Sequence, residues 1–181
     1  MLSSDVSMED YRKLEINQDK EAIVNFIRQR FTERYITPMK TDLQKKNGFT
    51  IMAISCLMIE TLESFYQGWS DTKNKSQWAF CNFFDRSKKF HFIKGHSQSF
   101  YKNVRCGILH QGETTGGWHI RRRGAIFDKV TNTVNAKKFH DEIEESLSDY
   151  CEELRASEWS APIWKAFRKK MESVCKNCEQ A

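Results

Sequence analysis

Residues 99–112, SFYKNVRCGILHQG, are the stretch on which our interpretation of the chain depends. The apolar side chains in it recur at the three- and four-residue spacing of a helix that buries one face. Gly112 follows them, and a glycine readily adopts the left-handed conformation that ends a helix. The sequence therefore predicts the last turns of a buried helix that stops at Gly112. Its apolar face consists of Phe100, Val104, Ile108 and Leu109.

Arg105 and His110 interrupt this apolar face. An arginine is always charged and binds phosphate through its forked donors, and a histidine can transfer a proton near neutral pH. Together they suit cleavage of an RNA phosphodiester, which needs a base, an acid and a cation. This chemistry requires no metal, and we predict no metal site and no cofactor. Five helical residues turn the chain by about 140°, so the two side chains share a pocket only if the helix end distorts or a partner helix supplies a second pair.

The run Arg105-Cys106-Gly107-Ile108-Leu109-His110 resembles the R-x4-H signature of the HEPN superfamily (higher eukaryotes and prokaryotes nucleotide-binding domains). The flanking Tyr101-Lys102-Asn103-Val104 and Gln111-Gly112-Glu113 agree with it. The resemblance implies an all-α bundle of about five to six helices. It also implies a metal-independent endoribonuclease whose Arg and His line one cleft of a homodimer, as in many toxin–antitoxin and anti-phage proteins. Cys106 departs from the pattern, because many active members have a polar residue there.

On this resemblance Arg105 holds the scissile phosphate and His110 acts as general acid or base, with the second chain's histidine in the opposite role or helping to position it. The products would be a 2′,3′-cyclic phosphate and a 5′-hydroxyl. Three residues are accessory candidates: Asn103 as a nearby polar group, Tyr101 packing under Arg105, and Glu60 orienting Arg105. An antitoxin or another regulatory partner is also expected.

A non-catalytic HEPN-like module that binds nucleotide, RNA or a partner protein is the alternative. In that interpretation Arg105 forms a buried pair with Glu60, and His110 bonds to a carbonyl at the helix end. Cys106 favours this alternative. The two interpretations differ in whether the Arg105 and His110 side chains are open to solvent.

The most hydrophobic helix is predicted from Phe49 to Trp69, and it is apolar around nearly its whole circumference. Such a helix is central in its bundle or covered by a partner chain, which favours a homodimer. Glu60 lies within it and needs a partner, either as an acid at the edge of the core or as the group that orients Arg105. The most apolar part, residues 49–62, is shorter than the ~20 residues that span a bilayer, so no membrane segment is predicted.

Arg121, Arg122 and Arg123 follow the motif helix after a loop-like stretch. They either bind an RNA backbone or lie in a solvated loop. Residues 118–120 and 125–127, with 130–134 beyond them, have strand-like composition and predict a short β-hairpin insertion.

The remaining segments predict further helices. One begins after Asp19 and ends or kinks at Thr37-Pro38, and an aromatic one covers residues 78–90, where the rings either fill a core or stack bases. Asn135 caps a long helix, and the last helix begins at Pro162. Residues 1–18 are polar and predict an N-terminal arm, which leaves a single helical domain over residues 19–181.

The composition of the 181 residues fits a single-domain protein with a net charge of +5, which allows an anionic partner. Its six cysteines lie in helical contexts and no signal peptide is visible, so we predict a reduced, cytoplasmic protein. Cys175 and Cys178 form one C-x-x-C pair without the further ligands that zinc needs. No phosphate-binding glycine loop or nucleophile elbow is present, which leaves Arg105 and His110 as the catalytic candidates.

Overall fold

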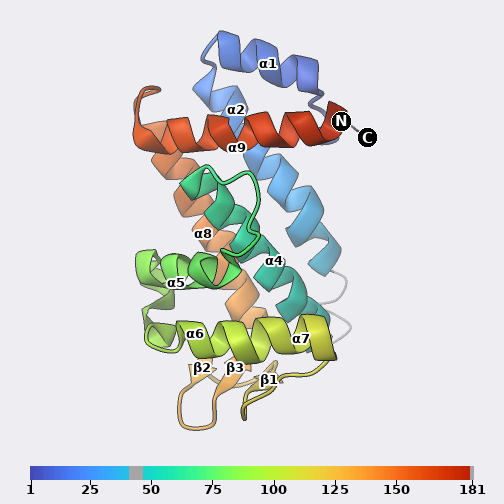
Figure 1. Ribbon diagram of the computed structural model, residues 1–181, viewed down its shortest axis with the longest axis vertical. Coiled ribbons are helices and arrows are strands. Elements are labelled where there is room, and N and C mark those ends of the chain that lie inside the picture. The colour runs from blue at the N-terminus through green and yellow to red at the C-terminus, as the bar shows by residue number, and fades with distance from the viewer. Residues whose placement is uncertain (41–46, 180–181) are drawn as a thin grey trace.

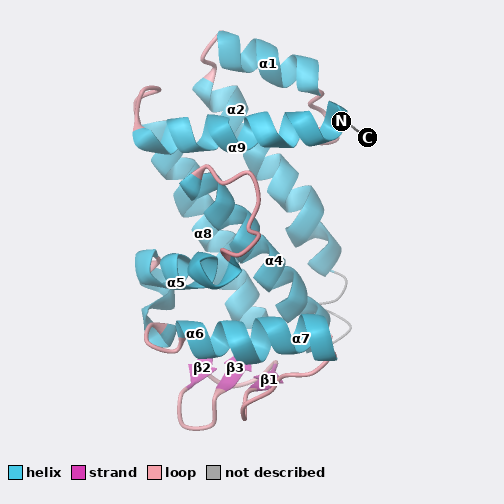
Figure 2. Cartoon of the chain, in the orientation of Figure 1, coloured by secondary structure: helices cyan, strands magenta, loops and turns pink. Residues whose placement is uncertain are grey.

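A computed structural model describes residues 1–40 and 47–179 of the chain. Most of this part is helical, as predicted, with a small three-stranded sheet at one end (Figure 2). The helices are α1 (Met8–Ile16), α2 (Lys20–Phe31), α4 (Gly48–Gln67), α5 (Ser76–Arg86), α6 (Ser97–Phe100), α7 (Cys106–Gln111), α8 (Ala136–Ala156) and α9 (Pro162–Glu179), with π-helical segments η1 (Thr32–Ile36) and η3 (Tyr101–Arg105) and the 3-10 segment η2 (Lys88–Ile93).

Helix α4 runs through the middle of the molecule and contacts α5, α8 and α9 (Figure 1). It begins where the Asn47 side chain accepts a hydrogen bond from the Thr50 amide, and it ends at Gly68 with a φ of +64°. The helix is long and apolar enough to cross a membrane, but 61% of its most apolar window is buried inside the fold. It is therefore the core helix predicted from its composition. The sequence TDLQKKNG at residues 41–48, with its Asn47-Gly48 turn signal, predicts a connector before this helix, and most of it lies outside the described residues.

Two carboxylates are buried on α4, and the fold supplies an arginine for each. Glu63 is fully buried and accepts two hydrogen bonds from Arg86 at the end of α5, at 3.1 and 2.5 Å. The Arg86 guanidinium carbon also lies 3.6 Å from the centre of the Tyr66 ring, and the Tyr66 hydroxyl donates to Glu153 on α8. This cluster joins three helices through one arginine.

The N-terminal segment corrects the prediction of a polar arm. Ser7 and Asp10 form a capping box that starts α1, and Leu2 is fully buried. Tyr11 is 1% exposed and packs against the rings of Phe26 and Phe167. Helix α1 has few apolar residues and so a weak periodicity, and its place beside α2 and α9 comes from this tertiary packing (Figure 1). Residues 1–18 thus belong to the same body as the rest.

Pro38 does not end its helix, because residues 37–40 are still helical. The wide turn η1 directly precedes them, with the Thr37 amide bonded to the Thr32 carbonyl. Proline has no N–H to donate and clashes with the carbonyl four residues earlier in a regular helix. The π turn changes that local pairing and so accommodates the proline within the helix.

The sheet differs in pairing from the predicted hairpin. Its strands are β1 (His119–Arg121), β2 (Phe127–Asp128) and β3 (Thr133–Asn135), in the order β1-β3-β2. The antiparallel pair is β2 with β3, and β1 joins β3 in parallel. Asn132 adopts a left-handed conformation with a φ of +48° in the turn between β2 and β3. The strands β1 and β2 therefore do not pair with each other.

His140 is a buried residue of α8, 1% exposed, whose Nδ1 lies 3.0 Å from the Ser55 hydroxyl on α4. Its Nε2 has no hydrogen-bond partner among the described residues. Burial lowers the pKa of His140, and Lys137 lowers it further while Asp141 opposes the shift. The ring is therefore a neutral part of the core.

We expect the protein to lose stability when the pH falls below about 6.5, the ordinary pKa of histidine. The folded state keeps His140 neutral while the unfolded chain binds a proton, so the free energy of unfolding falls by up to about 1.4 kcal/mol per pH unit until the folded pKa is reached. Urea unfolding of the wild type and of His140→Gln between pH 7.5 and 5 measures this contribution. An equal pH dependence in both proteins would contradict the prediction.

We also expect Arg86→Ala to lower the free energy of unfolding by about 3 kcal/mol. It leaves the buried Glu63 charge uncompensated, and the lower end of the usual range applies because a third of the Arg86 side chain is exposed. Arg155→Ala is the control, because its partners Glu21 and Glu152 are 63% and 70% exposed and stay hydrated without the arginine, so these pairs contribute about 1 kcal/mol at most. Adding Glu63→Gln to Arg86→Ala should restore part of the loss. Equal losses for Arg86→Ala and Arg155→Ala would refute this account.

Candidate functional site

The motif helix is built from α6, η3 and α7, which follow one another without a break over residues 97–111. It ends at Gly112 as predicted, with a φ of +70° and the Gly112 amide bonded to the Ile108 carbonyl. The helix widens into a π turn at Tyr101–Arg105, so Arg105 lies where the regular spacing resumes. It runs beside the sheet, at the end of the molecule opposite α1 (Figure 1).

Arg105 is held by the acid that the sequence singled out in the central helix. Its Nε donates to Glu60 at 2.6 Å, and the second carboxylate oxygen of Glu60 accepts from the Thr72 hydroxyl at 3.0 Å. The Arg105 and Glu60 side chains are only 15% and 9% exposed. Burial by itself lowers the pKa of Arg105, but the hydrogen bond and charge of Glu60 outweigh this and raise it. The guanidinium is therefore permanently charged and fixed in orientation.

The far end of the Arg105 guanidinium has donors left over. Its Nη1 lies 4.0 Å from the Cys106 sulfur, and its Nη2 makes no hydrogen bond to the described part of the chain. Tyr101 lies beside it, with the guanidinium carbon 5.6 Å from the ring centre. Burial and the neighbouring Cys106 thiol raise the pKa of Tyr101, which keeps its hydroxyl protonated. The terminal nitrogens of Arg105 are thus chemically able to bind an anion.

His110 lies one residue before the end of α7, and its side chain is exposed. It forms neither a hydrogen bond nor an ion pair with any residue of the described ranges, so the carbonyl bond expected for the non-catalytic alternative is not found there. Arg105 faces α4 while His110 faces solvent, as the turn of about 140° between them requires. One chain therefore does not bring the two side chains together.

Asn103, expected as an accessory polar group near Arg105, instead bonds to Ser99 and Thr115. Its Nδ2 donates to the Ser99 carbonyl at 3.0 Å, and its Oδ1 accepts from the Thr115 hydroxyl at 3.0 Å. The Thr115 amide also bonds to the Asn103 carbonyl. Asn103 thus fastens the loop after Gly112 to the motif helix, which the sequence pattern did not indicate.

Gly107, in the middle of the motif, allows the same loop to approach. A β-carbon at this position would lie 2.5 Å from the Glu113 carbonyl oxygen, closer than real contacts occur. The Glu113 amide bonds back to the Gly107 carbonyl at 3.4 Å. The close approach of backbone to backbone explains why a glycine stands between Arg105 and His110.

Residues 121–124, which we call the arginine loop, begin at the last residue of β1 and lead away from it. Arg121 and Arg123 are exposed and Arg122 is half-buried beside Gly48 at the start of α4. The loop is tied to the motif helix through Trp118, whose indole N–H donates to the Ser99 hydroxyl at 3.0 Å. The three arginines are therefore on a segment anchored to the helix that carries Arg105.

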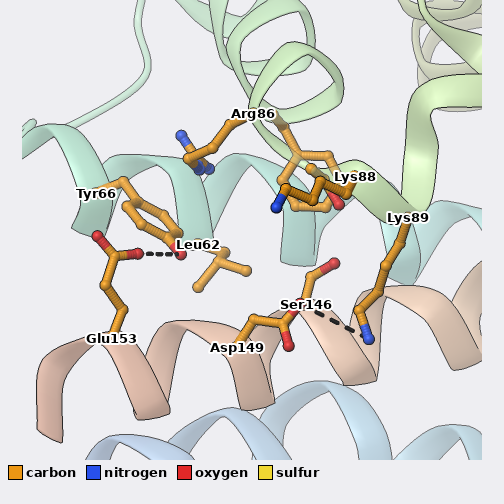
Figure 3. Close-up of a pocket in the computed structure, with 10 residues that line it drawn as sticks. Leu62, Tyr66, Arg86, Lys88, Lys89, Ser146, Asp149 and Glu153 are labelled. Atoms are coloured by element: carbon orange, nitrogen blue, oxygen red, sulfur yellow. Dashed lines mark hydrogen bonds and ion pairs between the residues drawn. The ribbon is translucent and has the colours of Figure 1, made fainter. Parts of the chain in front are cut away.

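A separate hollow, which the sequence pattern did not indicate, lies between α4, α5, η2 and α8. Figure 3 shows Arg86 and Tyr66 on one side of it and Asp149 and Lys89 on the other. Its arginine is bound to Glu63, and Lys89 lies within 3.7 Å of Asp149. The sequence does contain one sign of this hollow. Glu63 is a second acid in an apolar helix, and a buried acid requires a cation as its partner.

Metal-binding and redox features are sparse in the described part. No group of three or more His, Cys, Asp or Glu residues within residues 1–40 and 47–179 could hold a metal ion. All six cysteines are free thiols, including Cys175 and Cys178.

Comparison of the chain with protein-family models, curated proteins and solved structures finds no match. The function is therefore inferred from the residues and their geometry. The HEPN resemblance remains a prediction that rests on the motif around Arg105 and His110.

We expect Gly107→Ala to lower the free energy of unfolding by about 1–3 kcal/mol, although alanine favours helices by about 1 kcal/mol over glycine. The added methyl group forces the loop at Glu113 away from the helix. Gln111→Ala, at an exposed position of the same helix, should leave stability unchanged or slightly increased. Thermal denaturation of both variants is the measurement, and a Gly107→Ala protein as stable as wild type would rule out the close approach.

Proposed function

We propose that this protein is a metal-independent endoribonuclease that acts as a homodimer, with Arg105 and His110 as its catalytic residues. The main support for the proposal is the difference between the environments of the Arg105 and His110 side chains. Arg105 is anchored by Glu60 through one nitrogen and keeps terminal donors, while His110 is exposed at the end of the same helix with no partner among the described residues. A fixed cation and an unengaged proton carrier are two of the three groups that phosphodiester transesterification needs, and the third is a second proton carrier.

Arg105 binds the scissile phosphate and stabilises the charge that develops on it during cleavage. Glu60 fixes the plane of the guanidinium, and Tyr101 packs beside it, so the cation does not have to be ordered when substrate binds. His110 transfers the proton, either from the 2′-hydroxyl or to the leaving 5′-oxygen. The products are a 2′,3′-cyclic phosphate and a 5′-hydroxyl.

A second copy of the chain completes this site, because Arg105 and His110 of one chain face different ways. Leu57 on α4 and Leu109 on α7 are 40% and 42% exposed, and α4 and α7 contact each other. Leu109 next to His110, together with the exposed Leu57 on the helix that α7 contacts, favours a dimer that pairs the two α7 ends, so that each arginine meets the histidine of the other chain. Both proton-transfer roles are then filled by the two histidines.

Arg121, Arg122 and Arg123 extend the contact with the RNA backbone beyond the cleavage site. Such a nuclease works in the cytoplasm and is held in check by an antitoxin or another regulatory partner, in a toxin–antitoxin or anti-phage system. This biological role rests on the motif resemblance.

A non-catalytic HEPN-like module that binds nucleotide, RNA or protein is the second candidate. The largely buried Arg105–Glu60 pair favours it, because such a pair stabilises the fold without any substrate. Cys106 beside Arg105 favours it as well. In this case His110 is an ordinary surface residue.

We expect His110→Ala to lower the rate of RNA cleavage at least 100-fold and to leave the melting temperature within about 1 °C, because an exposed ring contributes little packing. Arg105→Ala should lower cleavage by about 100- to 1,000-fold and also reduce stability, because it leaves Glu60 unpaired. Gel analysis of labelled RNA incubated with the purified protein in EDTA measures both. His91→Ala, an exposed histidine of η2, is the control.

The outcomes separate the two candidates. Cleavage in EDTA by the wild type and His91→Ala but not by His110→Ala supports the nuclease. RNA binding without cleavage by any of the proteins supports the binding module, and activity that EDTA abolishes and divalent metal restores would refute the metal-independent mechanism.

A further inference from the structure

Two surface hollows flank the arginine loop, and Arg121 and Arg123 line both of them. The first has a volume of about 660 Å³ and lies between η2 and the β2–β3 turn, with Phe92 and Phe127 in its lining. The second is formed with the start of α4 and contains Phe49, which is 37% exposed. A pair of arginines therefore lies between two aromatic surfaces.

The first hollow has an excess of positive charge. Arg121, Arg123 and Lys129 line it together with a single acid, Asp128. No hydrogen bond or ion pair joins these three cations to another residue of the described ranges. Asp128 accepts the amides of Val130 and Thr131 through one oxygen, and these hydrogen bonds, with a smaller contribution from the charge of Arg121, lower its pKa. Three cations beside one acid leave the hollow with positive charge for an anionic ligand.

The aromatic part of this hollow is the end of an existing stack. Phe127 lies nearly parallel to the buried Trp118, with ring centres 5.4 Å apart and an interplanar angle of 16°. Phe92 is inclined to Phe127 at 6.3 Å. Phe127 is only half-buried and lines the hollow, and the His96 ring packs edge-on against it at 5.4 Å.

The loop that carries the arginines is also held in place. Asn135 donates from its side chain to the Gly124 carbonyl at 3.2 Å, and its amide bonds to the Ile126 carbonyl. The same side chain caps α8 by accepting from the Lys138 amide. One residue therefore fixes the loop to the sheet and to the longest helix, so the two arginines are presented from a rigid base.

We infer that the hollow lined by Phe127, Phe92, Arg121, Arg123 and Lys129 binds an unpaired nucleotide of single-stranded RNA. The base continues the Trp118–Phe127 stack, and the flanking phosphates contact Arg121 and Arg123. The inference deepens the proposed function and rests on it for RNA as the natural ligand. It assigns to this surface a preference for unpaired bases, which backbone contacts by arginine alone do not provide.

Size and chemistry favour a nucleotide over a simple polyanion. The hollow falls within the roughly 300–1,000 Å³ of typical ligand sites. Bases stack on aromatic rings, and every base presents the flat face that this requires. A duplex buries its bases against one another and offers only phosphates, so it cannot use Phe127.

Fluorescence anisotropy with labelled RNA strands of about 12 nucleotides tests the inference. The protein is the full chain carrying His110→Ala, so that cleavage does not interfere. The probes are an intact single strand, an abasic strand with the same number of phosphates, and the duplex, with heparin as a competitor. Variants added to this background are Phe127→Leu, Phe92→Leu and Arg123→Gln, and Lys165→Gln on α9 is the charge-matched control.

We expect the intact strand to bind at least fivefold more tightly than the abasic strand, the lower end of what one stacked base contributes. Phe127→Leu should remove most of this difference and change the affinity for the abasic strand less than twofold. Arg123→Gln should weaken the binding of both strands and reduce the slope of log affinity against log salt by about 0.7. Melting curves exclude unfolding, and Phe92→Leu gives a second test if Phe127→Leu unfolds.

Equal binding of intact and abasic strands, a preference for the duplex, or an equal loss for both strands in Phe127→Leu would overturn the inference and leave a general polyanion surface that heparin occupies. Cleavage assays on the wild type are read separately. Base-dependent binding without cleavage refutes the nuclease and not this site, whereas cleavage without base dependence refutes this site alone.

Discussion

The fold depends on two carboxylates placed in its most apolar helix. A buried charge without a partner costs several kcal/mol, so Glu60 and Glu63 must each find a cation. They do so in different segments, Glu63 with Arg86 of α5 and Glu60 with Arg105 of the motif helix. The two pairs join both segments to α4, and the two-pronged bond of Arg86 to Glu63 restricts the geometry of its pair further.

This constraint also shapes the candidate site. The bond that neutralises Glu60 also orients Arg105. The same contact therefore stabilises the fold and holds the guanidinium in a fixed position. The sulfur of Cys106 and the ring of Tyr101 lie beside the guanidinium, which keeps donors at its terminal nitrogens. His110, five residues further on, is exposed. One residue of the motif is thus largely buried against the core, and the other lies at the surface.

The loop and sheet after Gly112 are also held by contacts with distant segments, here with the motif helix and α8. Asn103 and the indole of Trp118 tie this segment back to the motif helix, and Gly107 gives it room to approach. Asn135 then connects the arginine loop to the start of α8. Because the motif helix and the start of α8 both hold this segment, the exposed arginines and the Phe127 ring keep a defined position relative to the motif helix.

The sequence by itself determined the features that depend on neighbouring residues. These include the caps at Asp19 and Asn135, the stop at Gly112, and the divergence of Arg105 and His110 around one helix. The pairing of Glu60 with Arg105 was one of two alternatives for that acid in the sequence. Only the tertiary structure decided between them and gave Glu63 its partner Arg86, since the partners are 45 and 23 residues apart. It also decided that residues 1–18 fold against α2 and α9, and that β3 lies between β1 and β2. Caps and periodicity act within a few residues, whereas ion pairs, strand order and the docking of a weakly apolar helix are settled by packing between distant segments.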